Sequence, residues 1–198
     1  MALDPLATVA DLEALGMTVD ASEVAIAGQY LAVASAAVRE AAGSPISETT
    51  STLTLEGEAD QRLRLPGLPV TAVASVKIDG VAVTDWRLRS QRLWRAAGWT
   101  GCDGPSEVEV TQTHGLAVVP ADIVDLVCRM VAGALKAYRA AEDGSGLAVD
   151  KVITSERIGD YAVTFANDGR ISEMDLPQYW RERLEARFGG GIDLVRSR

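Results

Sequence analysis

The sequence predicts an α+β fold in which a β subdomain is inserted into a helical core. Apolar residues recur at helical spacing at about 21–42 and again at about 120–142, which indicates two long helices. Between them, at about 51–113, short segments alternate apolar and polar residues, as antiparallel strands with one buried face do. A chain of 198 residues is long enough to bury a substantial core. We therefore expect one domain with a β-rich insertion.

Two helices are expected before this insertion. Thr8 and Asp11 have the spacing of a capping box at the head of a short helix, 9–15. The longer helix at 21–42 carries apolar residues on two faces, and two apolar faces require two neighbours. One neighbour would be the core of the same subunit, and the other a second helix or a second subunit. The second face consists of Ile26, Tyr30, Val33 and Ala37.

The clearest strand of the insertion is expected at 70–78. Its even positions are all apolar, whereas Thr71, Ser75 and Lys77 are polar, which is typical of a strand with one face on a core. The Asp79-Gly80 pair that follows favours a tight type I′ turn. Further short strands should complete an antiparallel sheet or a small sandwich. The positions expected to face the core are Val70, Ala72, Ala74, Val76 and Ile78.

The C-terminal part should contain a long helix, a β hairpin and a last helix. Pro120 suits the first turn of the amphipathic helix at 120–142. The hairpin is expected within 149–166 and the last helix at 176–188, after which glycines release an arm, 189–198. The arm is either a frayed end or a segment that docks on a partner. Its candidate docking residues are Ile192, Leu194, Val195, Arg196 and Arg198.

Charge is distributed unevenly along the chain. The net charge is −9, and the ten acidic residues and single basic residue of segment 1–60 account for all of it, since the rest is balanced. An acidic segment is poorly suited to gripping nucleic acid, because phosphate contacts need Lys and Arg. The longest apolar runs are too short to span a bilayer. We expect a soluble intracellular protein with no membrane partner.

Few residues are suited to catalysis or to metal binding. His114 is the only histidine, and Cys102 and Cys128 are the only cysteines, so no zinc-binding spacing exists. A lone histidine beside a glycine is more often a turn or surface residue than a general base. The glycine-rich loop 98–104 lacks the Lys-Ser/Thr ending of a phosphate-binding loop. We therefore expect no enzyme, no metal and no cofactor.

One segment, 86–99, has the composition of an interaction surface. Its arginines are interleaved with tryptophans, and stacking aromatic rings on a basic ribbon can hold single-stranded nucleic acid. Arg and Trp also anchor protein interfaces, and we favour a contact between subunits. The arginines are Arg87, Arg89, Arg92 and Arg95, and the tryptophans are Trp86, Trp94 and Trp99. The residues expected at a subunit interface are Tyr30, Val33, Ala37, Arg87, Arg89, Trp94 and Trp99.

The pattern of the chain over about 20–140 resembles the head-tail connector, or adaptor, proteins of long-tailed double-stranded-DNA bacteriophages. The resemblance rests on the Ala-rich helix, on LRLPGLPVTAVASVKIDG, on VEVTQTHGLAVVPADI and on the long helix that follows. The stretch SERIGDYAVTF also resembles a later part of such proteins. Some members of this family are almost wholly helical, so the β-rich insertion is a departure.

The resemblance implies a structural virion protein, with residues 1–198 as one connector domain. Its copies would form a ring, commonly of about twelve, in the virion neck between the portal protein and the next connector, stopper or tail protein. Assembly would take place in the host cytoplasm, and double-stranded DNA would pass through the ring without sequence-specific contact. The acidic segment 1–60 is a candidate lining of this channel. Two alternatives stay open: a DNA-binding module that uses segment 86–99, and a stopper or tail-completion protein.

Overall fold

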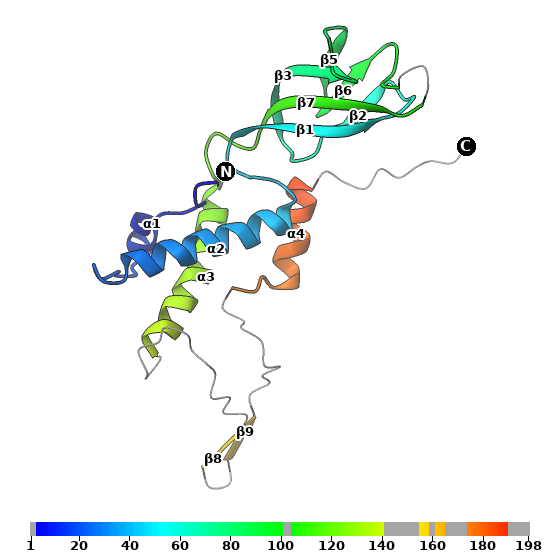
Figure 1. The fold of residues 1–198 in the computed structure, drawn as a ribbon. Coiled ribbons are helices and arrows are strands. Elements are labelled where there is room, and N and C mark those ends of the chain that lie inside the picture. The colour runs from blue at the N-terminus through cyan, green and yellow to red at the C-terminus, as the bar shows by residue number, and fades with distance from the viewer. Residues whose placement is uncertain (1–2, 101–103, 141–154, 159–160, 165–173, 190–198) are drawn as a thin grey trace.

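The computed structural model describes residues 3–100, 104–140, 155–158, 161–164 and 174–189. It contains a helical body and a β subdomain that is inserted between the second and third helices (Figure 1). The chain therefore has the α+β fold with an inserted β subdomain that the sequence predicts.

Four helices form the helical body, and α2 lies against both α3 and α4 (Figure 1). The capping box is present at the head of α1, where the Thr8 hydroxyl accepts a hydrogen bond from Asp11 N–H and the Asp11 carboxylate accepts one from Thr8 N–H. Buried apolar residues of all four helices form a single core. The helices are α1 Val9–Ala14, α2 Val24–Ala42, α3 Ala121–Ala140 and α4 Gln178–Phe188.

The helix expected from residue 21 begins instead at Val24, because Asp20 and Glu23 close a turn ahead of it. Glu23 N–H donates to the carbonyl oxygen of Asp20 (2.8 Å), and the Glu23 carboxylate accepts from Asp20 N–H (3.1 Å). The same carboxylate accepts two hydrogen bonds from the Arg139 guanidinium, at 2.8 and 2.6 Å. This ion pair fastens the start of α2 to the last turn of α3.

Two antiparallel sheets form the β subdomain. The larger has the strand order β1-β7-β3-β4 and the smaller the order β2-β6-β5. Leu63 and Leu93 of the smaller sheet share one buried cluster with Val76, Val108 and Val110 of the larger, so the sheets pack as a small sandwich. The strands are β1 Thr49–Gly57, β2 Arg62–Arg64, β3 Val70–Ile78, β4 Val81–Val83, β5 Trp86–Arg89, β6 Arg92–Arg95 and β7 Ser106–His114.

The strand expected at 70–78 is present, but its alternation is not strict. Ala72 and Ala74 are exposed, although the sequence places them on the core face, and Val73 is half-buried. The pairing of β3 with β7 shifts register after Val70 and again after Val73. Each β-bulge adds a residue to one strand and so resets which side chains face the core. The prediction for Ala72 and Ala74 was therefore wrong.

The turn after β3 is confirmed. Asp79 and Gly80 have φ angles of 49° and 78°, as both central residues of a type I′ turn must be in the left-handed region. The Asp79 carboxylate also accepts a hydrogen bond from Glu107 N–H (2.9 Å), which ties the turn to the start of β7.

Two segments of chain join the helical body to the β subdomain and run side by side. Leu116 N–H donates to the Ile46 carbonyl (2.7 Å), and Glu48 N–H donates to the Leu116 carbonyl (2.9 Å). Arg39, near the end of α2, donates to the carbonyl oxygen of Pro45 (2.9 Å) and to that of Asp4 (2.6 Å). We call these two connecting segments, 43–48 and 115–120, the hydrogen-bonded neck of the subunit.

The later elements agree with the sequence where they are described. β8 Ser155–Ile158 and β9 Tyr161–Thr164 pair as an antiparallel hairpin, and the last helix begins at Gln178. The expected arm lies outside the described residues, apart from Gly189, and with it the candidate docking residues Ile192, Leu194, Val195, Arg196 and Arg198. Within the described residues, no helix has the length and apolar character that crossing a membrane requires.

Candidate functional site

The outer face of the smaller sheet brings together arginines from three strands. In one cross-strand row Trp94 of β6 stands between Arg62 of β2 and Arg87 of β5. In the next outward-facing row Arg92 stands between Arg64 and Arg89. The row between them is leucine, and it faces the core. We call this surface the arginine face: Arg62, Arg64, Arg87, Arg89, Arg92 and Trp94.

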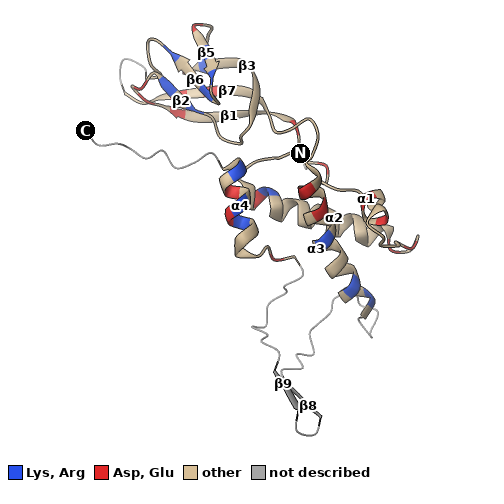
Figure 2. Cartoon of the chain, turned by 180° about the vertical axis from the view of Figure 1, so that it is seen from behind, with Lys and Arg blue, Asp and Glu red and all other residues tan. Residues whose placement is uncertain are grey.

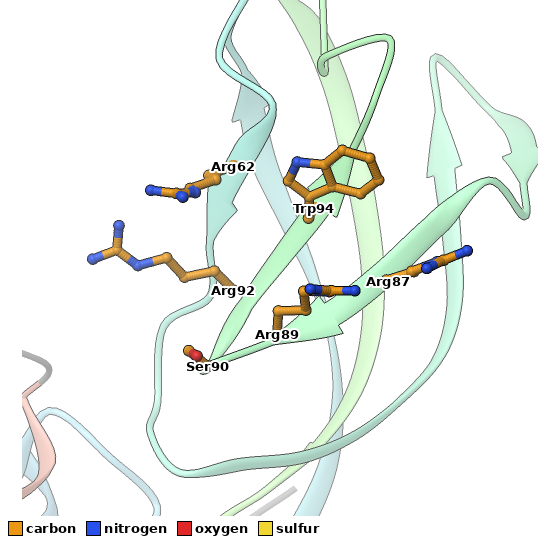
Figure 3. Close-up of a pocket in the computed structure, with 6 residues that line it drawn as sticks. All are labelled: Arg62, Arg87, Arg89, Ser90, Arg92 and Trp94. Atoms are coloured by element: carbon orange, nitrogen blue, oxygen red, sulfur yellow. The ribbon is translucent and has the colours of Figure 1, made fainter.

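A hollow of about 640 Å³ lies on the arginine face. The described residues that line it are the arginines other than Arg64, with Ser90 and Trp94. None of them is acidic. In Figure 3 the Trp94 ring stands between the side chains of Arg62 and Arg87, and the side chains of Arg89 and Arg92 border the same space. The sheet therefore presents an aromatic ring surrounded by cationic groups.

Three guanidinium groups of this face lack an acidic partner in the described part of the chain. Arg62, Arg87 and Arg89 form no ion pair there, and Arg87 and Arg89 are exposed. The arginines of α3 and α4, by contrast, are paired with carboxylates: Arg129 with Asp125, Arg139 with Glu23, Arg181 with Asp175 and Arg187 with Asp122. Figure 2 shows the basic residues of β2, β5 and β6 together on one subdomain.

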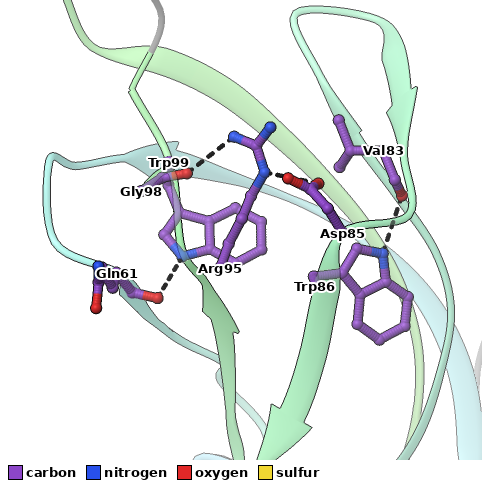
Figure 4. Close-up of polar contacts among 7 residues, drawn as sticks. All are labelled: Gln61, Val83, Asp85, Trp86, Arg95, Gly98 and Trp99. Atoms are coloured by element: carbon purple, nitrogen blue, oxygen red, sulfur yellow. Dashed lines mark hydrogen bonds and ion pairs between the residues drawn. The ribbon is translucent and has the colours of Figure 1, made fainter.

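Two other residues of segment 86–99, Trp86 and Arg95, make hydrogen bonds within the β subdomain (Figure 4). Arg95 donates to the Asp85 carboxylate (2.8 Å) and to the Gly98 carbonyl (2.9 Å), and its guanidinium lowers the pKa of Asp85 through that hydrogen bond. The indole N–H of Trp86 donates to the Val83 carbonyl (3.0 Å). The alternation of side chains along β5 and β6 sends Arg95 and Trp86 to the side opposite Trp94.

Trp99 does not lie at a surface. Its exposed fraction is 0%, it belongs to the core of the β subdomain, and its indole N–H donates to the Gln61 carbonyl (3.1 Å). A side chain with no exposed area cannot contact a neighbouring subunit, so the assignment of Trp99 to the subunit interface was wrong.

The turn between β5 and β6 fixes the position of the arginine face. Ser90 and Gln91 both have positive φ angles, 49° and 67°, which residues other than glycine and asparagine seldom adopt. The Gln91 side-chain carbonyl accepts a hydrogen bond from Val70 N–H (2.6 Å), so the tip of this hairpin is held against the start of β3. The sequence pattern did not identify this contact, because serine and glutamine do not indicate a positive φ as glycine or asparagine would.

A second candidate surface is the side of α2 that faces away from the core. Val33 has an exposed fraction of 51%, whereas Tyr30 and Ala37 are partly buried against the apolar core of their own subunit. The exposed side therefore differs from the second face expected from the sequence. We call it the outer face of α2: Ala25, Gln29, Ala32, Val33 and Ala36.

The only histidine of the sequence is buried, not at a surface turn. Its ring nitrogens contact the Gly67 carbonyl (2.9 Å) and the Ser51 hydroxyl (2.8 Å), so His114 ties β7 to β1 and to the turn before β3. Burial raises the pKa of the Cys128 thiol to about 11, which makes it a poor nucleophile. Among the described residues, no three His, Cys, Asp or Glu side chains converge as metal ligands would.

The acidic residues of segment 1–60 are not gathered on one part of the molecule. Asp11 and Glu13 belong to α1, whereas Glu56 and Glu58 lie at the end of β1 and just beyond it, in the β subdomain (Figure 2). The candidate channel lining is therefore divided between the two subdomains.

Comparisons with known protein families and with curated proteins find no match to this chain.

Proposed function

We propose that this chain is a structural virion protein whose copies form a ring in the neck of a long-tailed bacteriophage. The ring joins the portal protein to the next connector or tail protein and surrounds the passage for double-stranded DNA. The proposal unites the resemblance of residues 20–140 to head-tail connectors with a surface on α2 that suits contact between copies.

The observation that carries the proposal is the composition of the outer face of α2. The helix has no charged residue between Val24 and Val38, on its exposed side or elsewhere. A helix on a protein surface normally has a charged or polar exposed side, and one that is apolar all round is normally buried. The outer face has Gln29 as its sole polar side chain among the five residues that define it. Its small residues would let another helix approach closely.

A second copy of the chain is the occupant that we propose for this face. In a ring each subunit uses two different patches, so one apolar helix face can meet a different surface of the next copy. The arginine face lies on the other subdomain (Figures 1 and 2). Arg87, Arg89 and Trp94 are therefore separated from Tyr30, Val33 and Ala37 of α2, which were also expected at a subunit interface.

Electron microscopy of the full-length chain mixed with portal rings from the same genome tests the proposal. We expect an additional ring-shaped layer on the portal. Val33→Glu places a charge on the outer face of α2 and should abolish the layer while leaving the thermal unfolding temperature of the free chain unchanged, because Val33 is exposed.

Val118→Glu is the matched control, since Val118 is 80% exposed in the segment before α3, and it should leave the layer intact. An absent layer for the natural sequence would contradict the connector function. A normal layer for Val33→Glu would contradict the role of α2 alone.

A further inference from the structure

We propose that the arginine face is a binding site for single-stranded nucleic acid, in which Arg62, Arg87 and Arg89 contact phosphates and a base stacks on Trp94. This goes beyond ring formation and does not depend on it, because the residues concerned lie on the β subdomain and not on α2.

The electrostatics of the face call for an anionic ligand. Arg62 and Arg87 flank Trp94 in one cross-strand row, Arg89 lies on the same face of β5, and all three arginines are exposed. Arg62, Arg87 and Arg89 have no ion-pair partner in the described part of the chain, although the protein has an excess of nine negative charges from which to supply one. A polyanion would neutralise these three positive charges.

The kind of cation points to phosphate. All five basic residues of the face are arginines, whereas the one lysine of β3, Lys77, lies on the larger sheet, paired with Glu109. A guanidinium group offers a planar fork of donors that matches phosphate oxygens and also stacks on flat rings, which an ammonium group does not.

The presence of Trp94 favours nucleic acid over an acidic protein segment as the ligand of this face. It is half-buried and lies between Arg62 and Arg87, within a hollow of about 640 Å³. Carboxylates need only the cations, whereas nucleic acid also offers a ring to stack on the indole. A single strand can present that ring, because the bases of a duplex are already stacked and paired. The leucine row beneath the face packs into the core of the β subdomain and so holds the three strands in position.

Fluorescence anisotropy with a labelled oligothymidine tests this site on the full-length chain. The triple variant Arg62→Ala, Arg87→Ala, Arg89→Ala should weaken binding by at least about tenfold. It should also make the negative slope of log K against log salt shallower by about two, since each of the three lost phosphate contacts on a single strand contributes about 0.7.

The control is a second triple variant, Arg129→Ala, Arg181→Ala, Arg187→Ala, which alters the net charge equally at exposed arginines of the helical body and should bind as the natural chain does. Trp94→Leu should weaken oligothymidine binding about tenfold, and Trp94→Phe should restore most of it. Binding of polyglutamate should not change with either Trp94 variant.

Three results would overturn the proposal. The first is the absence of oligothymidine binding by the natural chain, and the second is equal loss in the two triple variants. The third is binding that is independent of Trp94. If binding is independent of Trp94 and polyglutamate binds as tightly as the oligonucleotide, the ligand of the face is an acidic protein segment. If a DNA duplex binds as tightly as the oligonucleotide, the face binds the backbone of double-stranded DNA.

Discussion

At the scale of single residues, Gly57 controls how closely the end of β1 approaches the loop around Trp99. A Cβ atom at Gly57 would overlap the carbonyl oxygen of Trp99 and the hydroxyl oxygen of Ser106, which are themselves hydrogen-bonded to each other. The Trp99 oxygen belongs to the backbone, so the loop cannot yield by a change of rotamer. Only glycine, which has no Cβ, can lie this close to the two groups.

We therefore predict that Gly57→Ala destabilises the β subdomain. Overpacking of this kind costs roughly 1–3 kcal/mol, and near-ultraviolet circular dichroism should report it as an earlier loss of the signal from the buried Trp99 during heating.

Gly133→Ala provides the contrast with Gly57→Ala. Gly133 lies inside α3 with nothing within 4 Å of the position its Cβ would take, so alanine should stabilise the chain by roughly 0.5–1 kcal/mol. An unchanged or raised unfolding temperature for Gly57→Ala would contradict the packing described for this loop.

At the scale of elements, the Glu23–Arg139 ion pair joins the beginning of α2 to the end of α3. The Glu23 side chain is 11% exposed and that of Arg139 36%. Hydrogen bonds from Arg139, and then from Asp20 N–H, lower the pKa of the Glu23 carboxyl to about 2 from 4.5. A pKa that is lower in the folded than in the unfolded chain stabilises the fold above the unfolded value, and this stabilisation is lost as the pH falls toward the folded value.

We predict that Glu23→Gln lowers the unfolding temperature at pH 7, and that the difference from the natural chain shrinks between about pH 4.5 and pH 2. Thermal unfolding followed at several pH values measures this. Asp125→Asn disrupts the pair with Arg129, in which the Arg129 side chain is 76% exposed and that of Asp125 39%. This variant should lower the unfolding temperature much less, because solvent screens exposed pairs. A difference for Glu23→Gln that is constant with pH would contradict this role of the carboxylate.

Elements defined by local pattern were predictable from the sequence. The alternation of β7 extends from Ser106 to His114 without a break, and the Asp79-Gly80 turn follows from residues that tolerate positive φ. The bulges of β3 were not predictable, because they arise from its pairing with β7 and not from its own residues.

The candidate site was only partly predictable for a similar reason. Arg87, Arg89, Arg92 and Trp94 are close together in the sequence, but Arg62 joins them only because β2 pairs with β6. The composition of segment 86–99 also does not reveal which side chains turn inward. Trp99 lies beyond the end of β6, so strand alternation does not fix its burial; the packing of the two sheets does.

At the scale of the whole molecule, two subdomains offer two surfaces of different chemistry. The helical body has the uncharged outer face of α2, and the β subdomain has the arginine face. The hydrogen-bonded neck, with Arg39 at its base, holds the subdomains together. In the proposed ring, α2 makes contacts between copies, and the arginine face is left for a polyanion.

Photo-crosslinking at position 33 tests this account most directly. A small diazirine amino acid in place of Val33, in chains assembled on portal rings, should crosslink to a second copy of the same chain, and mass spectrometry should map the attachment to a peptide of that copy. Crosslinks confined to the chain that carries the label, in complexes that have formed a ring-shaped layer, would contradict the proposed contact between copies through α2.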